Sequence, residues 1–184
     1  MFNDRKVAQM AVFLLNKSGA RMPHLKLMKL LYLADREAMA HYGGPISGDR
    51  IVAMPHGPVL SMTLNLMDGD VESSPNGWDS LISDKENYEL SIKHAITCND
   101  LDELSQAEIS VLETVWKQFG SMGKWEIRDY THEHCPEWID PNGSSAPISY
   151  ESVFLALGRS KSVAAELSAH IEAERTLDKL FATL

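Results

Sequence analysis

Apolar residues recur at helical spacing along most of the chain, and this pattern predicts a mainly α-helical fold. Ser105, with Glu108 three residues later, forms a capping box that marks the start of one helix. Pro58 suits the first turn of another helix, because its ring fixes φ near the helical value. The helices expected from these signals cover residues 3–17, 24–42, 58–66, 105–119, 124–134, 149–157 and 161–182.

Strand signals are short and lie between the predicted helices. Residues 50–54 are partly β-branched and bounded by Gly48 and Pro55, which favours a strand. A small β-hairpin is expected within residues 80–93, where two apolar stretches are separated by charged residues. We therefore predict one compact helical domain over residues 1–184, built from a helical part at 1–67, an acidic loop and hairpin at 68–104 and C-terminal helices at 105–184.

The helix expected at residues 24–42 is apolar around most of its circumference. Such a helix is normally buried at the centre of a domain, with other helices packed around it. Asp35 is an exception, because its carboxylate starts from the apolar side and needs a partner if it is buried. His56 and Arg50 are the nearest candidate partners in sequence, and the alternative is a groove edge in contact with water. The sector left for water consists of Lys26, Lys29, Arg36 and Glu37.

The sequence Met54-Pro55-His56-Gly57-Pro58 has a backbone explanation. Pro55 favours an extended conformation in the residue before it, Gly57 permits a positive φ, and Pro58 presets the following turn. The motif formed by Pro55, Gly57 and Pro58 is therefore a rigid strand-to-helix junction. His56 at its apex is a candidate for contacting a partner, bonding Asp35 or capping the next helix.

The composition favours a globular cytoplasmic protein. With 184 residues, 44% of them hydrophobic, the chain can bury one substantial core. The apolar run at residues 7–15 is interrupted by Gln9 and is too short to span a bilayer, so we expect no membrane association. Cys98 and Cys135 lie in segments of different character and do not suggest a disulfide framework, which agrees with a reducing cytoplasm.

Charge is unevenly distributed along the chain, whose formal net charge is −9. Residues 1–67 hold 8 Lys and Arg against 4 Asp and Glu, and residues 109–184 hold 7 against 11. Residues 68–108 hold 2 against 11 and form an acidic segment. Such a segment repels phosphate backbones and attracts basic protein surfaces. This argues against autonomous nucleic-acid binding and for a basic partner, while the alternative is solvated loop charge.

Potential metal ligands are close together in the stretch Thr131-His132-Glu133-His134-Cys135. A metal site there would use His132, His134 and Cys135, and a small metal-dependent hydrolase would use Asp129 with the two histidines. The spacing matches neither CxxC nor HExxH, so an ordinary surface helix end is the favoured interpretation. Neither a nucleophile elbow nor a phosphate-binding glycine loop is present, and we predict neither an enzyme nor a cofactor.

Two of the four tryptophans occupy loop-like sequence. Trp78 and Trp138 are flanked by Pro and Gly, where burial in the core is less assured than at the helical position of Trp116. Exposed indoles are common at protein interfaces, because they supply contact area at low entropic cost. The alternative is that both loops fold back onto the core.

Several stretches of the chain resemble a known family. They are residues 26–35 (KLMKLLYLAD), 42–43 (YG), 56–59 (HGPV), 104–108 (LSQAE), 131–138 and 147–151 (PISYE). Through them almost the whole chain is similar to the Panacea domain, also called the SocA-like antitoxin domain. The resemblance implies a bacterial or phage antitoxin that neutralises a partner toxin by direct contact, without catalysis. It also implies a toxin encoded by the adjacent gene and, in one branch of the family, delivery of the toxin to a cytoplasmic protease.

These inferences combine into a predicted toxin-contact surface beside the central helix and on the acidic segment. Binding there would occlude the active or target-binding surface of the toxin. The alternatives from other functional classes are the metal-dependent hydrolase and a transcriptional regulator, which the charge balance opposes. The candidate contact residues are Tyr32, Asp35, His56, Trp78, Asp79, Asp84, Glu86 and Trp138.

Overall fold

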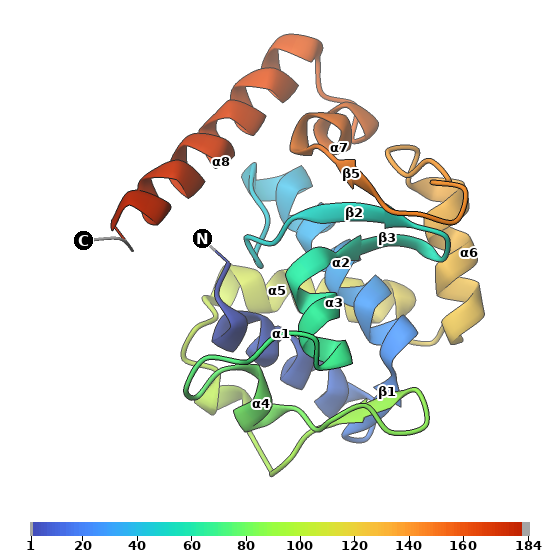
Figure 1. Cartoon of the computed structure of the whole chain (residues 1–184), viewed down its shortest axis with the longest axis vertical. Coiled ribbons are helices and arrows are strands. Elements are labelled where there is room, and N and C mark those ends of the chain that lie inside the picture. The colour runs from blue at the N-terminus through green and yellow to red at the C-terminus, as the bar shows by residue number, and fades with distance from the viewer. Residues whose placement is uncertain (1, 182–184) are drawn as a thin grey trace.

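The computed structural model describes residues 2–181, apart from the side chains of residues 98, 178 and 179. This part of the chain is mainly α-helical, as predicted, and short antiparallel strands form two small sheets (Figure 1). The helices are α1 (Asp4–Lys17), α2 (His24–Tyr42), α3 (Ser61–Asp68), α4 (Trp78–Leu81), α5 (Gln106–Phe119), α6 (Lys124–His134), α7 (Tyr150–Ala156) and α8 (Lys161–Phe181), with a 3₁₀ turn at Cys98–Asp100. The strands are β1 (Arg21–Pro23), β2 (Ile51–Met54), β3 (Gly57–Leu60), β4 (Glu89–Ser91) and β5 (Ala146–Ile148).

Helix α2 lies at the centre of the fold, as its apolar circumference predicted. It contacts α1, α5, α6 and β3, and its leucines at 27, 30 and 31 are fully buried. The helix ends at Gly43, whose φ of 78° gives a left-handed cap. Lys29 departs from the prediction, because it belongs to the sector assigned to water and the structure buries it completely.

The three-stranded sheet has the order β3-β2-β5, and its neighbouring strands are antiparallel. β2 confirms the strand expected at 50–54. Residues 57–60 form β3 instead of starting the predicted helix, which begins only at Ser61. Pro58 is compatible with this position because β3 is an edge strand, where no further strand requires the missing N–H. The rigid junction is therefore a strand-to-strand turn.

A second sheet pairs β1 with β4, starting at Arg21↔Ser91. The hairpin expected at 80–93 is present as the isolated bridges Ile82↔Ile92 and Glu86↔Glu89, while β4 itself takes β1 as its partner. β1 is only three residues long and follows α1 closely, so its pattern alone does not predict a strand. Its pairing fastens the acidic segment to the N-terminal helices.

The C-terminal helices begin close to the predicted positions. Ser105 and Glu108 form the expected capping box, and the Ser149 hydroxyl accepts a hydrogen bond from the Ser152 N–H at 3.1 Å. The long helix α8 packs mainly against α7 and continues beyond it toward the C-terminus (Figure 1). Only the middle of its predicted apolar face is therefore covered: Ile171 is buried, whereas Val163, Leu177 and Phe181 are exposed.

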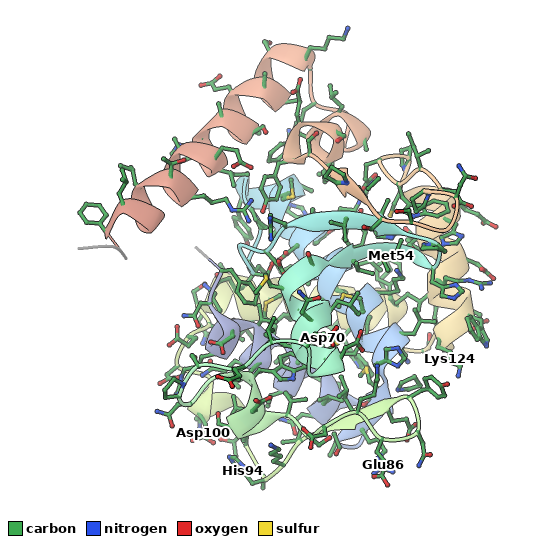
Figure 2. All side chains as sticks on the ribbon, in the orientation of Figure 1. Met54, Asp70, Glu86, His94, Asp100 and Lys124 are labelled. Atoms are coloured by element: carbon green, nitrogen blue, oxygen red, sulfur yellow. The ribbon has the colours of Figure 1, made fainter. Side chains whose placement is uncertain are left out.

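The hairpin of the acidic segment and α8 lie at opposite ends of the molecule. Figure 2 shows Glu86, His94 and Asp100 along the end remote from α8, while Met54 and Lys124 lie on the side formed by the β2–β3 turn and α6. Within residues 2–181, no helix combines the length and the apolar character needed to cross a membrane.

Candidate functional site

The family-like residues of α2 meet the β2–β3 turn in a buried polar cluster. We call Lys29, Tyr32, Gly57, Thr131 and Glu137 the α2 polar cluster. The Lys29 ammonium donates a hydrogen bond to the Pro58 carbonyl oxygen at 2.7 Å. Burial lowers the pKa of Lys29 to about 7, since the charged form loses its hydration. Lys29 therefore faces the turn.

Gly57 is the closest point of approach between the turn and this cluster. Its φ of 94° is a conformation that other residues rarely adopt. A Cβ atom at this position would lie 2.9 Å from Lys29 Nζ and 2.8 Å from Thr131 Oγ1. Both the backbone and the packing thus require glycine here, as the sequence predicted for the backbone alone.

Tyr32 belongs to the same buried cluster and does not line a groove. Its hydroxyl donates a hydrogen bond to the Glu137 carboxylate, which also accepts one from Arg36 Nε at 2.7 Å. The Glu137 side chain has no exposed surface. Burial, reinforced by the nearby charge of Glu137, raises the pKa of Tyr32 well above its ordinary value. No local pattern pointed to Glu137, because it lies more than a hundred positions from its partners Tyr32 and Arg36.

Asp35 is buried, but its partners are neither His56 nor Arg50. Its carboxylate accepts hydrogen bonds from the backbone N–H groups of Ile46 and Ser47, both at 2.9 Å, and from the Ser47 hydroxyl. Burial raises the pKa of Asp35 to about 7, although these hydrogen bonds act in the opposite direction. Asp35 therefore holds the loop after α2 and is removed from any contact surface.

A second buried carboxylate, Asp49, completes this arrangement at the start of α3. It accepts hydrogen bonds from the N–H groups of Met62 at 3.0 Å and Thr63 at 2.8 Å. These are donors that a helix leaves unpaired in its first turn. The loop between α2 and β2 thus orients two acidic side chains for structural roles.

Aromatic rings fix the remaining parts of the turn. The rings of His132 and Trp138 are stacked, with centroids 3.9 Å apart, and Trp138 Nε1 donates a hydrogen bond to the Met54 carbonyl at 2.9 Å. His56 itself is exposed at the apex, with its ring edge-on to that of Trp125. Trp125 is 50% exposed, and its neighbours Lys124 and Arg128 both place cations near its ring. His56 and Trp125 are the parts of this region that a partner can reach.

The potential metal ligands near the end of α6 are engaged with separate neighbours. His132 stacks on Trp138 and His134 stacks on Tyr130. Burial, with the charge of Glu137, raises the pKa of the buried Cys135 thiol to about 11, which disfavours the thiolate that a metal requires. Among the residues that the structure describes, no group of three His, Cys, Asp or Glu side chains is placed to hold a metal ion.

The hairpin of the acidic segment differs from the α2 polar cluster, because its charged side chains are exposed. Trp78 is only 1% exposed, so its loop folds back onto the core. In contrast, Asp79, Asp84 and Glu86 are exposed, and none forms an ion pair with another residue in the described part of the chain. Tyr88 at the tip is 71% exposed and has a positive φ of 63°. We call Asp79, Asp84, Glu86 and Tyr88 the hairpin surface. Sequence reasoning missed Tyr88, although an aromatic residue among acids in a turn was a signal.

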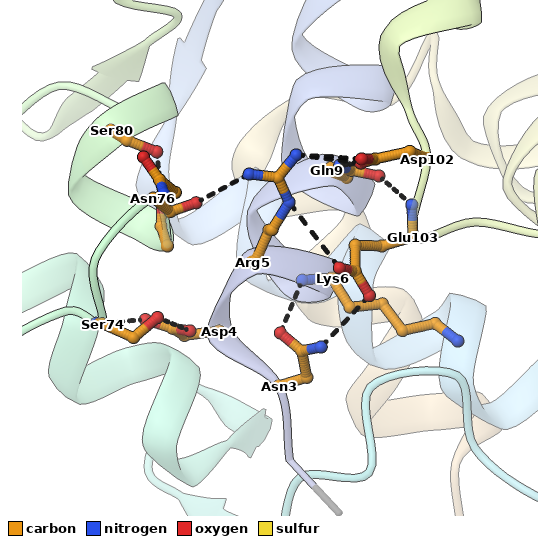
Figure 3. A network of polar contacts seen from close by, with 11 residues as sticks. Asn3, Asp4, Arg5, Lys6, Gln9, Ser74, Asn76, Ser80, Asp102 and Glu103 are labelled. Atoms are coloured by element: carbon orange, nitrogen blue, oxygen red, sulfur yellow. Dashed lines mark hydrogen bonds and ion pairs between the residues drawn. The ribbon is translucent and has the colours of Figure 1, made fainter.

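Other acids of the segment are used within the fold (Figure 3). Arg5 of α1 forms an ion pair with Asp102 at 3.0 Å and lies 3.6 Å from a carboxylate oxygen of Glu103. On the opposite side of α1, Asp4 accepts hydrogen bonds from the backbone and hydroxyl of Ser74. These contacts fasten both ends of the acidic segment to α1, whereas the carboxylates of the hairpin surface form no ion pair with a described residue. Lys93 Nζ donates a hydrogen bond to the backbone carbonyl of Asp79, not to its carboxylate.

Comparison with known proteins supports the resemblance seen in the sequence. A family model described as "Antitoxin SocA-like, Panacea domain" matches residues 27–139, which include most of α2, the β2–β3 turn, the hairpin of the acidic segment and Trp138. No curated protein and no solved structure matches the chain. The match covers well over half of the sequence, and the chain belongs to the antitoxin SocA-like, Panacea domain family.

Proposed function

We propose that this protein neutralises a cognate protein toxin by direct contact through the hairpin surface. Family membership supports a role in a toxin–antitoxin system in general. The observation that carries the finer proposal is the exposed, unpaired charge of Asp79, Asp84 and Glu86 along the segment whose tip carries the exposed ring of Tyr88. The toxin then has a basic surface, is encoded by the adjacent gene and is bound in the cytoplasm.

The chemistry of this surface suits an interface with a basic partner. Unpaired carboxylates in a segment of net charge −9 attract basic surfaces over several ångströms and accelerate encounter. Tyrosine contributes contact area with few rotatable bonds, and it is enriched among the residues that dominate binding energy. The acids would thus orient the toxin while Tyr88 anchors it. Binding would occlude the active or target-binding surface of the toxin.

Other candidate contacts differ in their access to a partner. Burial removes Tyr32, Asp35 and Trp78 from the surface of the folded chain. Trp138 is partly buried and holds the turn through its bond to Met54. His56 is exposed beside Trp125 and stays a candidate for a secondary contact.

Co-expression with the toxin from the adjacent gene tests the proposal. Asp84→Lys combined with Glu86→Lys should lower the affinity for the toxin at least about tenfold and abolish growth rescue, because attraction becomes repulsion. The matched control is Glu151→Lys with Glu166→Lys, which makes the same change in net charge at exposed acids of α7 and α8. Equal rescue by both double variants would refute the role of the hairpin surface.

The fate of the bound toxin distinguishes blocking from delivery to a protease. If the protein acts by occlusion alone, the half-life of the toxin in cells is unchanged or longer when the antitoxin is present. A shorter half-life that depends on one cytoplasmic protease would identify an adaptor. Purified components, in which no protease is present, give a second measurement of occlusion.

A further inference from the structure

Helix α8 leaves an apolar tip at its C-terminal end. Leu177 is 54% exposed and Phe181 is 72% exposed, and their spacing of four places them on one face of the helix. Figure 1 shows α8 running away from α7 and ending clear of the sheets, near the N-terminal end of the chain. Within the described residues 2–181, the side chains of Leu177 and Phe181 are therefore left largely uncovered.

Arg175 secures α8 to the body just before this tip. Its Nη2 donates a hydrogen bond to the Gly48 carbonyl at 3.2 Å, and its guanidinium lies 5.4 Å from the centre of the Tyr150 ring. The N-terminal half of the helix packs against α7. The position of the exposed tip is thus fixed by contacts that do not involve the tip itself.

A groove of about 770 Å³ lies between α8 and the sheet, and its volume is typical of sites that receive a ligand or large side chains. Partly exposed Phe2, Val52 and Met62 contribute apolar surface to it, and Thr176 contributes from α8. Arg50 is exposed at this groove and makes no ion pair with any residue of the described range 2–181. The groove therefore combines apolar surface with an unpaired cation.

We propose that this groove receives the α8 tip of a second copy of the chain, so that the protein forms a two-fold symmetric dimer. Leu177 and Phe181 of each copy would cover the apolar surface of the groove in the other. Glu174 is exposed and shares a face with them at spacings of three and seven. Within one chain its carboxylate lies 3.3 Å from His170 Nε2, and in the dimer it would exchange this exposed neighbour for Arg50 of the other copy.

The apolar and charged features of the tip complement those of the groove. A two-fold interface requires both halves of the contact on one chain, with each half accessible to the other copy. Thr176 lines the groove, whereas Leu177 and Phe181 lie on a different face of the same helix. Two tips can therefore pass side by side, each directing its apolar face toward the body of the other copy. This inference does not depend on the proposed toxin.

Sedimentation of the purified full chain over a wide concentration range tests the dimer. The wild type should show twice the chain mass of 20.5 kDa. Leu177→Glu with Phe181→Glu should be monomeric and should keep the wild-type helix content, because both side chains lie outside the core, while its melting temperature should lose the dependence on protein concentration that a dimer shows. Val163→Glu is the control for each single variant, Leu177→Glu and Phe181→Glu, since it adds one negative charge at an exposed apolar position of α8 about 20 Å from Leu177. A monomeric wild type, or a dimer that persists in the double variant, would overturn the proposal.

A charge exchange tests the orientation of the two copies. Arg50→Glu should weaken dimerisation at least about tenfold, because the pair with Glu174 becomes repulsive. Combining it with Glu174→Arg should restore the dimer, while either single change leaves it weak. Failure of the combined variant to recover would reject this pairing. Toxin neutralisation by the monomeric variant, measured in parallel, separates this result from the proposed function.

Discussion

The α2 polar cluster and the hairpin surface are both rich in polar side chains, but they use them in opposite ways. In the cluster, Lys29, Tyr32 and Glu137 are buried and each has a hydrogen-bond partner. On the hairpin, Asp84 and Glu86 are exposed without ion pairs to described residues. The residues by which the chain resembles its family therefore hold the fold together, and the free charge lies elsewhere.

Substitutions in the two regions should differ in their effect on stability, because the polar groups of the cluster are buried and those of the hairpin are hydrated. A buried polar group that loses its partner costs roughly 1–3 kcal/mol, because its desolvation is no longer compensated. An exposed carboxylate is already hydrated, and its replacement usually changes stability by less than about 0.5 kcal/mol. Substitutions in the cluster should thus affect folding, and substitutions on the hairpin should affect binding.

The largest expected effect comes from Gly57→Ala. The substitution combines an unfavourable positive φ with a Cβ atom only 2.9 Å from Lys29 Nζ, and we expect it to lower the free energy of unfolding by about 2–4 kcal/mol. Gly143→Ala is the control, because Gly143 also has a positive φ but nothing lies within 4 Å of its Cβ position. Urea unfolding of both variants measures the difference. Equal losses would show that packing against Lys29 contributes nothing.

Tyr32→Phe should have the next largest effect. Removing the hydroxyl deprives the buried Glu137 carboxylate of one donor, and the expected loss of stability is about 1–3 kcal/mol. Tyr42→Phe should be nearly neutral, since Tyr42 is exposed. If Tyr32→Phe impaired toxin neutralisation while leaving the melting temperature unchanged, the assignment of Tyr32 to the fold would be wrong.

Asp35→Asn should alter the pH dependence of stability. The pKa of Asp35 is about 7 in the folded protein against an ordinary value of 3.8, so the folded state binds the proton more tightly. The resulting stabilisation is complete below about pH 4 and is lost as the pH rises through about 7, with a total of at most about 4 kcal/mol. Unfolding free energies at pH 5 and pH 8 should therefore differ less in Asp35→Asn than in the wild type. The exposed Asp84→Asn, as control, should follow the wild type.

Tyr88→Asn should change stability least of these substitutions, and it should lower the affinity for the toxin. Asparagine tolerates a positive φ better than tyrosine, so stability should stay constant or rise by up to about 1 kcal/mol even though a ring contact with His24 is lost. Affinity for the toxin should fall because the exposed ring is absent. Calorimetric titration with the toxin measures this loss, and an unchanged affinity would exclude Tyr88 as an anchor.

Much of the secondary structure followed from local sequence. Helical periodicity predicted α2, α5, α6 and α8, and the capping box at Ser105 predicted where α5 begins. Local rules failed at Pro58, which is equally acceptable at a helix start and in an edge strand. They also missed β1, because a three-residue strand carries little pattern and depends on its distant partner β4.

The candidate site was less predictable than the fold. The partners of Asp35 are backbone N–H groups at Ile46 and Ser47, and every sequence offers such groups at nearly every position. Burial of Trp78 was one of two alternatives that its loop-like sequence left open. The acids at 79, 84 and 86 are exposed, as expected for charged residues. Their lack of ion pairs is a result of the tertiary structure, which places Arg5 of α1 beside Asp102 instead.

The sequence by itself determined most of the helices, the glycine at position 57, the acidic segment and the family, because periodicity, φ preference, charge and motif are local properties. It did not indicate the short helix α4 or the start of α3 at Ser61. Only the tertiary structure decided that Lys29 and Tyr32 face inward to Pro58 and Glu137. A helix that is apolar over most of its circumference can be surrounded by neighbours on nearly every side. Which of its polar residues are then covered depends on segments distant in sequence, and local pattern does not encode their position.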